Sequence, residues 1–200
     1  MAGSLPIIRG LYAVTPDEQN TDVLLAKVEA ALRGGIHVLQ YRNKRADHKL
    51  QTQQARAILP LCRQYQVPFI INDSIKLCLT LDADGVHLGA DDGNLTEARA
   101  RLGPGKILGA SCYNRLDLAI GAAKAGADYA AFGACFASGT KPDAVAAPLD
   151  LFVQARQAIS IPLVAIGGIT EVNAAQAVAA GADAIAVVGA LFGHENLAVI

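Results

Sequence analysis

Residues 68–92 read PFIINDSIKLCLTLDADGVHLGADD. Two apolar runs, residues 68–71 and 83–88, each lead directly into acid: Asp73 after the first, Asp91 and Asp92 after the second. Residues 74–81 are long enough for only a short helix, so the runs are predicted to be neighbouring parallel strands. Adjacent strands lie about 5 Å apart, so carboxylates after both strands can reach one small, hard cation such as Mg²⁺.

The composition is that of a globular protein with a full core. The chain has 200 residues, of which 52% are hydrophobic, and we expect one domain spanning residues 1–200. Seventeen Lys and Arg against 18 Asp and Glu give a net charge of -1. A nearly neutral chain has no general attraction for nucleic acid or an anionic membrane, so neither is expected as a partner, and any anion must be bound locally.

The cysteines and the N-terminal residues point to a cytoplasmic protein. The four cysteines contain no Cys-x-x-Cys pair, so reduced thiols are expected rather than disulfides or a zinc site. Residues 1–9 lack the apolar core of a signal peptide, and no segment has the length and apolarity of a membrane span. An exposed helix face is compatible with a homo-oligomer, but the sequence does not decide the oligomeric state.

Eight short apolar runs alternate with helical patterns along the chain. Four of them are entered by a similar turn of small residues, at residues 34–36, 82–85, 126–128 and 181–183. The predicted strands are Gly10–Thr15, Ile36–Gln40, Pro68–Ile71, Gly85–Leu88, Lys106–Ala110, Asp128–Gly133, Pro162–Ile166 and Ala184–Val188.

Eightfold alternation of strand and helix predicts an α/β fold, a single (β/α)₈ TIM barrel. A doubly wound open sheet is the structural alternative. The barrel is favoured because no Gly-x-Gly-x-x-Gly turn follows the first strand and because polar residues follow every strand. Two places fit less well: Pro60 should kink the helix over residues 48–65 or start a new turn, and only residues 190–200 remain for the last helix.

The second predicted strand ends in Gln40-Tyr41-Arg42-Asn43-Lys44. Gln40, Arg42 and Lys44 alternate, so in a continued strand they face the same side. An amide, a guanidinium and an ammonium group at one barrel mouth suit a phosphorylated ligand with hydrogen-bonding ring atoms. The alternative is a solvated basic loop, and this segment alone does not separate the two.

The aspartates after the third and fourth strands also have two interpretations. Asp73 and Asp92 each precede a helical stretch and can be ordinary N-caps. Their position on adjacent strands, beside a basic cluster, favours a metal-bridged diphosphate instead. Asp91 competes with Asp92 as the second ligand, and Asn72 can contact the ligand or stabilise the turn.

Later strand ends add small hydroxyl residues, glycines and one lysine. Ser111 ends strand five, and Ser138-Gly139-Thr140-Lys141 follow strand six, a composition typical of an anion-binding loop or of a plain surface loop. Gly167-Gly168 and Val188-Gly189 follow strands seven and eight, the recurring phosphate site of such barrels. His37 and His87 lie within predicted strands and are expected to be packed rather than catalytic.

Several motifs in series resemble thiamine phosphate synthase, over nearly the whole chain. They are Leu11-Tyr12-Ala13-Val14-Thr15, Gln40-Tyr41-Arg42-Asn43-Lys44, Ile71-Asn72-Asp73, Gly85-Val86-His87-Leu88-Gly89-Ala90-Asp91-Asp92, Gly139-Thr140-Lys141 and Ala165-Ile166-Gly167-Gly168-Ile169.

The resemblance implies a transferase that condenses hydroxymethylpyrimidine diphosphate with hydroxyethylthiazole phosphate, giving thiamine phosphate and pyrophosphate by a Mg²⁺-assisted dissociative mechanism. It implies Asp73 and Asp92 as magnesium ligands and Arg42, Lys44, Ser111 and Lys141 as catalytic residues. Contacts to the pyrimidine diphosphate would come from Gln40, Arg42, Lys44, Asn72, Ser111 and Lys141, with Tyr41 and Asn43 on the same segment, and contacts to the thiazole phosphate from Ser138, Gly139, Thr140, Gly168, Val188 and Gly189.

The chain departs from the family pattern at the thiazole phosphate site. Ala137 replaces the usual proline, Ser138 the usual threonine, and Gly189 the usual serine. Two alternatives therefore stay open: an isomerase similar to thiazole tautomerase, which would not need the set of Arg42, Lys44, both aspartates and Lys141, and a catalytically silent barrel that binds thiamine precursors. The tautomerase pattern has a histidine where this chain has Tyr113.

Overall fold

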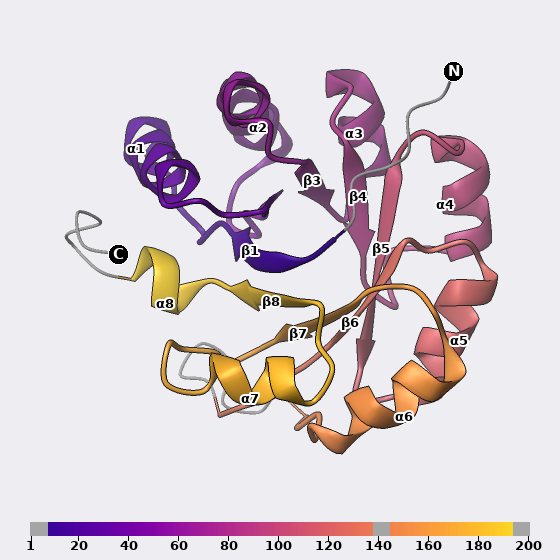
Figure 1. The fold of residues 1–200 in the computed structure, drawn as a ribbon. Helices are drawn as coiled ribbons and strands as arrows, with labels where there is room; N and C mark the ends of the chain where they lie inside the picture. Colours follow the sequence, from indigo (N-terminus) through magenta and orange to yellow (C-terminus); the bar gives the residue numbers. More distant parts are fainter. Residues whose placement is uncertain (1–7, 138–144, 194–200) are drawn as a thin grey trace.

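Eight parallel strands pair in sequence order, and β8 pairs back with β1 to close a barrel (Figure 1). The computed structural model describes residues 8–137 and 145–193. The closed sheet confirms the predicted (β/α)₈ barrel and excludes the open doubly wound sheet. The strands are β1 (Gly10–Val14), β2 (Val38–Tyr41), β3 (Phe69–Asn72), β4 (Gly85–Leu88), β5 (Ile107–Tyr113), β6 (Tyr129–Phe132), β7 (Leu163–Ile166) and β8 (Ala184–Val187).

The helices lie outside the strands (Figure 1). One helix, α2, runs through Pro60 as a single element, so the expected interruption does not divide it. The last helix, α8, begins at Gly189 and is four residues long. The helices are α1 (Thr21–Arg33), α2 (His48–Tyr65), α3 (Ile75–Leu81), α4 (Leu95–Leu102), α5 (Leu116–Lys124), α6 (Asp150–Ala158), α7 (Ala174–Ala179) and α8 (Gly189–Phe192).

Strand alternation divides the buried side chains into two sets. In β2, Leu39 and Tyr41 face the helix layer, whereas Val38 joins the cluster inside the barrel. The interior cluster combines branched and small residues with two tyrosines, so side chains fill the barrel rather than leaving a pore. Its members are Ile8, Tyr12, Val14, Val38, Ile70, Ile107, Tyr129, Ala131, Val164, Ala184 and Ala186.

Three of the four small-residue turns share an aspartate clamp at the amino ends of the strands. In each, the aspartate before a strand accepts a hydrogen bond from a backbone N–H at the beginning of the preceding strand: Asp84 from Phe69 at 2.8 Å, Asp128 from Leu108 at 2.7 Å and Asp183 from Leu163 at 2.7 Å. The short side chain thereby joins two consecutive strands of the barrel.

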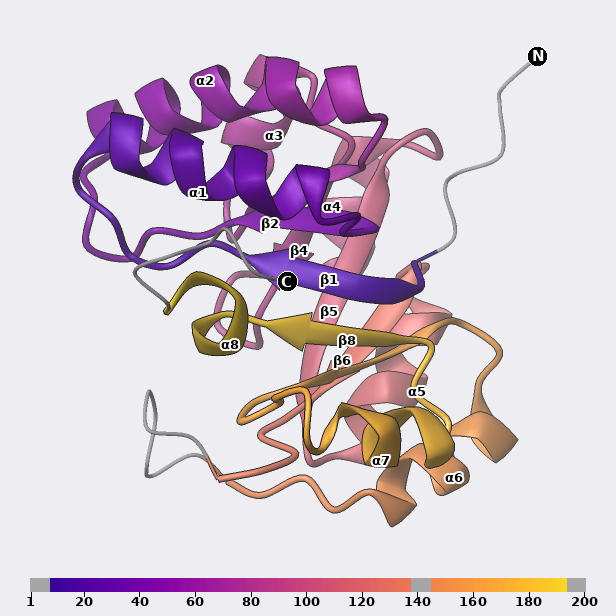
Figure 2. The same ribbon diagram turned by 60° about the vertical axis from the view of Figure 1, so that its left-hand side comes forward.

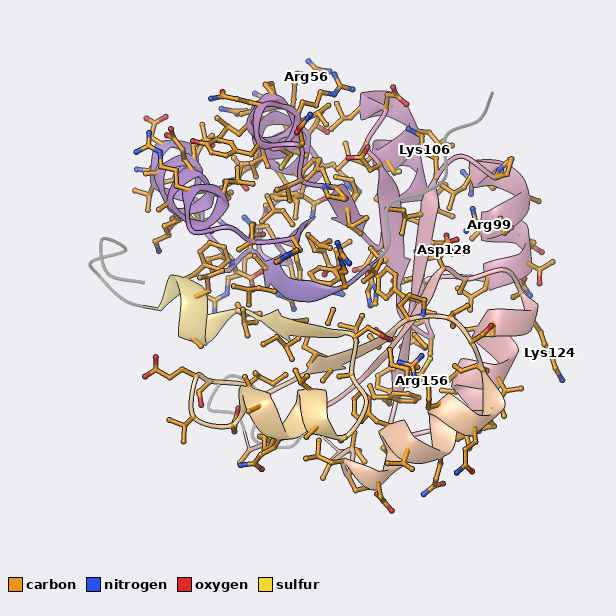
Figure 3. All side chains as sticks on the ribbon, in the orientation of Figure 1. Arg56, Arg99, Lys106, Lys124, Asp128 and Arg156 are labelled. Carbon is orange, nitrogen blue, oxygen red and sulfur yellow. The ribbon has the colours of Figure 1, made fainter. Side chains whose placement is uncertain are left out.

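Arginines from the helix layer complete two of these clamps. Arg99 of α4 pairs with Asp128 and donates to the carbonyl oxygens of Gly103, Gly126 and Lys106. Arg156 of α6 pairs with Asp183 in the same way. Figure 3 shows Arg99 beside Asp128, whereas Arg56 and Lys124 point away from the barrel. These clamps stabilise the end of the barrel opposite the site.

All strands run in one direction, so their carboxyl ends open at one mouth. In Figure 2, α8 follows the carboxyl end of β8 at this mouth. Within the described part of the chain, no helix combines the length and apolarity needed to cross a membrane. The four cysteines are free.

Replacing Asp128 by Ala should lower the free energy of unfolding by about 2 kcal/mol, because the Leu108 N–H and the Arg99 guanidinium both lose their acceptor. Urea unfolding measures the change. The control is the replacement of Lys124, an exposed residue of α5, by Ala. Its free energy of unfolding should lie within about 0.5 kcal/mol of that of the parent chain. Equal stability of the two variants would show that the clamp contributes nothing.

Candidate active site

Asp73 and Asp92 are not the N-caps of the helices that follow them. Ser74 caps α3, its hydroxyl accepting from the Leu77 N–H at 3.1 Å. Asn94 caps α4, its side-chain oxygen accepting from the N–H groups of Thr96 and Glu97. Neither carboxylate is therefore committed to a helix terminus, and the N-cap interpretation of the two aspartates is wrong.

Asp73 is held beside Lys44 by its backbone. It follows β3 with φ of 63°, a left-handed conformation that aspartate tolerates better than most residues. Its N–H donates to the carbonyl oxygen of His87 on β4 at 2.8 Å. Its carboxylate lies 2.7 Å from the Lys44 Nζ. A strained residue kept at the barrel mouth favours a functional role.

Asp92 reaches the same place from the loop after β4. Its Oδ2 accepts from the Gly89 N–H at 2.8 Å, and a Cβ on Gly89 would lie only 2.9 Å from that oxygen. Burial raises the pKa of Asp92, and the Asp73 carboxylate within hydrogen-bonding reach raises this pKa further. Asp91 is exposed. The two carboxylates that converge are therefore those of Asp73 and Asp92.

Tyr113, at the end of β5, contacts this acidic loop. A register shift between Ser111 and Tyr113 marks a bulge, and Tyr113 has φ of 51°. Its hydroxyl accepts from the Ala90 N–H at 3.4 Å. The side chain that replaces the tautomerase histidine thus lies against the loop that carries Asp92.

The segment after β1 positions the basic residues, a role that sequence reasoning missed. Asp17 accepts from the Arg42 guanidinium at 3.2 Å and from the backbone N–H of Lys44 at 2.8 Å. The Thr15 hydroxyl exchanges two 2.8 Å hydrogen bonds with the backbone of Arg42. The available signal was Thr15 at the end of the first predicted strand, followed directly by Pro16 and Asp17.

Two neighbours on the basic segment have structural side-chain contacts. The Tyr41 hydroxyl donates to Gln54 of α2 at 2.8 Å. The Asn43 amide donates to the same Gln54 oxygen and to the carbonyl oxygen of Glu18. Their polar side-chain groups therefore brace the loop against α2, and their assignment to the ligand-binding set stays a prediction.

A cavity of about 340 Å³ opens beside Lys44 and Asp73. It lies between the segment after β2 and the segment after β3. Arg42, Lys44, Asn72 and Asp73 contribute to its wall, and α2 adds His48 and Gln51. Tyr41, Asn43, Ile71, Ser74 and Leu77 complete the lining. The predicted residues Arg42, Lys44, Asn72 and Asp73 thus surround one space.

A continuous chain of hydrogen bonds crosses the barrel interior below the mouth, and we call it the polar chain. The Gln40 amide nitrogen donates to the Tyr12 hydroxyl at 2.9 Å, and the Tyr12 and Tyr129 hydroxyl oxygens are 2.7 Å apart. His87 Nδ1 lies 2.9 Å from the Tyr129 hydroxyl, and its Nε2 lies 2.8 Å from Ser111 Oγ. The polar chain therefore joins Gln40 to Ser111, both predicted ligand contacts.

His87 is packed, as expected, but its two ring nitrogens are links of this chain. Burial lowers the pKa of His87 to about 4, so the ring is neutral at physiological pH. His37 is instead exposed and precedes β2, contrary to the expectation that it is packed within a strand. Spacing alone does not reveal the role of His87, because its partners come from β5 and β6.

Glycines form the opposite side of the mouth. Gly168 has φ of 63°, and a Cβ there would lie 2.4 Å from the Ala137 carbonyl oxygen. The loop after β6 thus lies directly against the end of β7. A Cβ on Gly189, by contrast, meets nothing within 4 Å. Val188 is the N-cap residue of α8. The predicted residues Ser138, Gly139, Thr140 and Lys141 lie outside the described residues.

The carboxylates of Asp73 and Asp92 supply too few oxygen atoms to hold a hard cation by themselves, so a bound ligand and water must supply the rest. Across residues 8–137 and 145–193, no group of three or more His, Cys, Asp or Glu residues is arranged to hold a metal ion. Mg²⁺ commonly binds through one or two carboxylates, with substrate phosphates and water completing six oxygen ligands. Two adjacent carboxylates beside Lys44 fit that pattern.

A closed β/α barrel with acidic and basic groups at the ends of β2, β3 and β4 is the architecture of a TIM-barrel enzyme. Residues 11–191 match the family model described as thiamine monophosphate synthase. The chain belongs to this family.

Similar proteins cover nearly the same length. The chain is 60% identical to thiamine-phosphate synthase of Methylobacillus flagellatus, covering 94% of this chain and 90% of that one. It is 57% identical to thiamine-phosphate synthase of Aromatoleum aromaticum, covering 92% and 89%. Among solved structures, thiamine phosphate pyrophosphorylase from Pyrococcus furiosus superposes with a TM-score of 0.83 at 35% identity, over 94% of this chain and 89% of that one.

Neutral His87 predicts a pH dependence of stability. Its folded pKa, about 4, lies below the unfolded value near 6.5, so the unfolded chain binds more protons between these values. Stability contributed by His87 is complete above the unfolded value and is lost as pH falls toward 4. From pH 7 to pH 5 the loss should be about 2 kcal/mol.

Replacing His87 by Gln, which does not titrate, should remove this part of the pH dependence. Urea unfolding of both proteins at pH 7, 6 and 5 measures it as the change in their difference. Parallel pH profiles of the two proteins would contradict a buried neutral imidazole.

Proposed function

We propose that the protein condenses hydroxymethylpyrimidine diphosphate with hydroxyethylthiazole phosphate, releasing pyrophosphate and forming thiamine phosphate. Family membership and high identity to thiamine-phosphate synthases support this activity. The observation that carries the assignment of the site is that Asp73 pairs with Lys44 in the wall of one cavity and also lies within hydrogen-bonding reach of Asp92. Small phosphorylated molecules are the substrates.

In this proposal the diphosphate binds at the ends of β2, β3 and β4. Lys44 and Arg42 neutralise its charge, with Arg42 oriented by Asp17, and Asn72 lies in the same cavity wall. Asp73 and Asp92 would hold Mg²⁺, which, when bound, supplies further neutralisation of the leaving group. The carboxylates could not bind a diphosphate directly, since like charges repel. Lys141, outside the described residues, is assigned to the diphosphate as well.

The reaction needs no protein nucleophile. The bond between the methylene carbon and the diphosphate oxygen breaks, and its electron pair leaves with pyrophosphate. The aminopyrimidine delocalises the resulting positive charge, and the thiazole nitrogen then forms the new bond to the methylene carbon. The protein stabilises charge on the leaving group and holds both substrates in place.

The thiazole phosphate is assigned to the glycine side of the mouth. Gly168, Val188 and Gly189 would surround it together with Ser138, Gly139 and Thr140. Gly189 carries no hydroxyl, so its contribution is limited to the backbone N–H. The open space around Gly189 is consistent with a ligand on that side.

A pyrophosphate-release assay tests the activity and separates the alternatives. Synthase activity predicts release only when both substrates and Mg²⁺ are present. A silent barrel predicts binding of either substrate by isothermal titration with no release. A tautomerase-like isomerase predicts conversion of a thiazole phosphate with no dependence on the pyrimidine diphosphate.

Asp92→Ala should raise the Mg²⁺ concentration needed for half-maximal activity by about tenfold or more and lower kcat, because a carboxylate is lost from the metal site. Steady-state rates over a range of Mg²⁺ concentrations measure the effect. Asp91→Ala, one residue away and exposed, should leave the Mg²⁺ requirement at the parent value. The reverse pattern would assign the metal to Asp91.

Gly189→Ser should lower the KM for the thiazole phosphate by about tenfold, because the added hydroxyl can donate to a charged phosphate. The free space at this position accommodates the side chain. Gly189→Ala adds the Cβ without the hydroxyl and should leave KM nearly unchanged. Identical KM values for the Ser and Ala variants would move the phosphate away from α8.

A further inference from the structure

The two buried tyrosine hydroxyls of the polar chain must each donate their hydrogen to another member of it. Tyr12 and Tyr129 are 1% and 0% exposed, and each hydroxyl has a single hydrogen. No buried side-chain nitrogen or oxygen among the described residues lacks a partner. A hydroxyl hydrogen left without an acceptor in this interior would be strongly unfavourable. Each link therefore holds one hydrogen, and all of them point the same way along the polar chain.

Neutral His87 transmits that direction between its two ring nitrogens. A neutral imidazole carries one N–H, so one nitrogen donates and the other accepts. If Tyr129 donates to Nδ1, the ring hydrogen must be on Nε2, which then donates to Ser111. If Ser111 donates to Nε2, the ring hydrogen must be on Nδ1, and every link reverses. The hydrogen-bonding roles of Gln40 and Ser111 are consequently linked through the interior.

The amide of Gln40 sets the direction in this structure. Its nitrogen donates to Tyr12, which leaves Tyr12 to donate to Tyr129 and Tyr129 to donate to His87. His87 then donates to Ser111 from Nε2, and the hydrogen of the Ser111 hydroxyl is available for another acceptor. Ser111 is the last inward-facing residue of β5 before the bulge and is only partly buried, so that acceptor is at the mouth.

We propose that the polar chain is a positioning device for the reaction: Tyr12, Tyr129 and His87 fix the Ser111 hydroxyl as a donor toward the pyrimidine diphosphate. This inference rests on the proposed function for the identity of the ligand. Tyr12, Tyr129 and His87 are positioning residues, because each acts through Ser111 or Gln40 and their hydroxyl or ring atoms bond to one another. An anionic diphosphate requires a donor, and the direction set by Gln40 provides one.

The packing around the rings of Tyr12, His87 and Tyr129 also favours the observed orientation of the polar chain. A Cβ on Gly109 of β5 would lie 2.0 Å from Cζ of Tyr129, so glycine is required for the tyrosine ring to cross the barrel. The His87 and Tyr129 rings are stacked, with centroids 5.6 Å apart and an interplanar angle of 20°. Tyr12 meets Tyr129 edge-on at 5.9 Å. The rings are held by packing as well as by hydrogen bonds, which limits alternative orientations.

The first test observes the tautomer directly and needs no substrate. Nitrogen-15 NMR of protein labelled at histidine distinguishes a protonated from an unprotonated ring nitrogen, and the spectrum of His87→Gln identifies the His87 signals. We expect the ring hydrogen of His87 on Nε2 and none on Nδ1. A hydrogen on Nδ1 would overturn the proposal.

The second test breaks the polar chain in the middle. Tyr129→Phe keeps the ring but removes the hydroxyl that bonds to Nδ1, so His87 and the Ser111 hydroxyl are no longer held in one orientation and kcat should fall by about tenfold. The KM for the thiazole phosphate should not change. Tyr65→Phe is the control: it also removes one tyrosine hydroxyl, which accepts from Arg33 on the outer surface.

Unchanged kcat in Tyr129→Phe, equal to that of Tyr65→Phe, would overturn the positioning role. The NMR result does not depend on activity. If the parent chain shows the Nε2–H tautomer yet releases no pyrophosphate with both substrates, the proposed function has failed and Ser111 faces a different acceptor. If release is normal but His87 carries the Nδ1 hydrogen, the positioning proposal alone has failed.

Discussion

The parallel pairing of β2, β3 and β4 is the constraint on which the site depends. Tyr41 pairs with Ile71 and Asn72 pairs with His87, so the residues just after these strands begin at the same height on the barrel. Adjacent strands are about 5 Å apart, which is within reach of a lysine side chain and two aspartates. Lys44, Asp73 and Asp92 meet for this reason, although 48 positions separate the first from the last.

The barrel interior adds a second constraint. Most of it is filled with branched and small apolar residues, but the polar chain crosses it between β2 and β5. Buried polar networks stabilise a single arrangement only when every member is satisfied. Every buried side-chain polar atom of the described residues has a partner, so the polar chain meets this condition and holds Gln40 and Ser111 in one arrangement.

Sequence reasoning predicted the elements that depend on local patterns. Apolar runs, small-residue turns and alternation located all eight strands, and strand order brought Asp73 to Asp92 and Lys44. It did not predict the roles of Tyr12 and Tyr129, because residues that face each other across a barrel have no regular spacing in the chain. Asp17 was missed for the same reason: its partners, Arg42 and Lys44, come from the next strand. The hydrogen bonds of Tyr41 and Asn43 to Gln54 of α2 were not predicted either, because the sequence does not show which helix residue faces the end of β2.

The central claim is that Asp73 and Asp92 form one cation site rather than two. Binding of Mn²⁺ in the presence of inorganic pyrophosphate, followed by electron paramagnetic resonance, tests it in the parent chain, Asp73→Asn, Asp92→Asn and the double variant. Asparagine keeps the side-chain shape and tolerates the left-handed backbone at residue 73. We predict one bound Mn²⁺ per chain, a large loss of affinity in each single variant, and little further loss in the double variant. Independent, additive losses in the two single variants would contradict a shared ion.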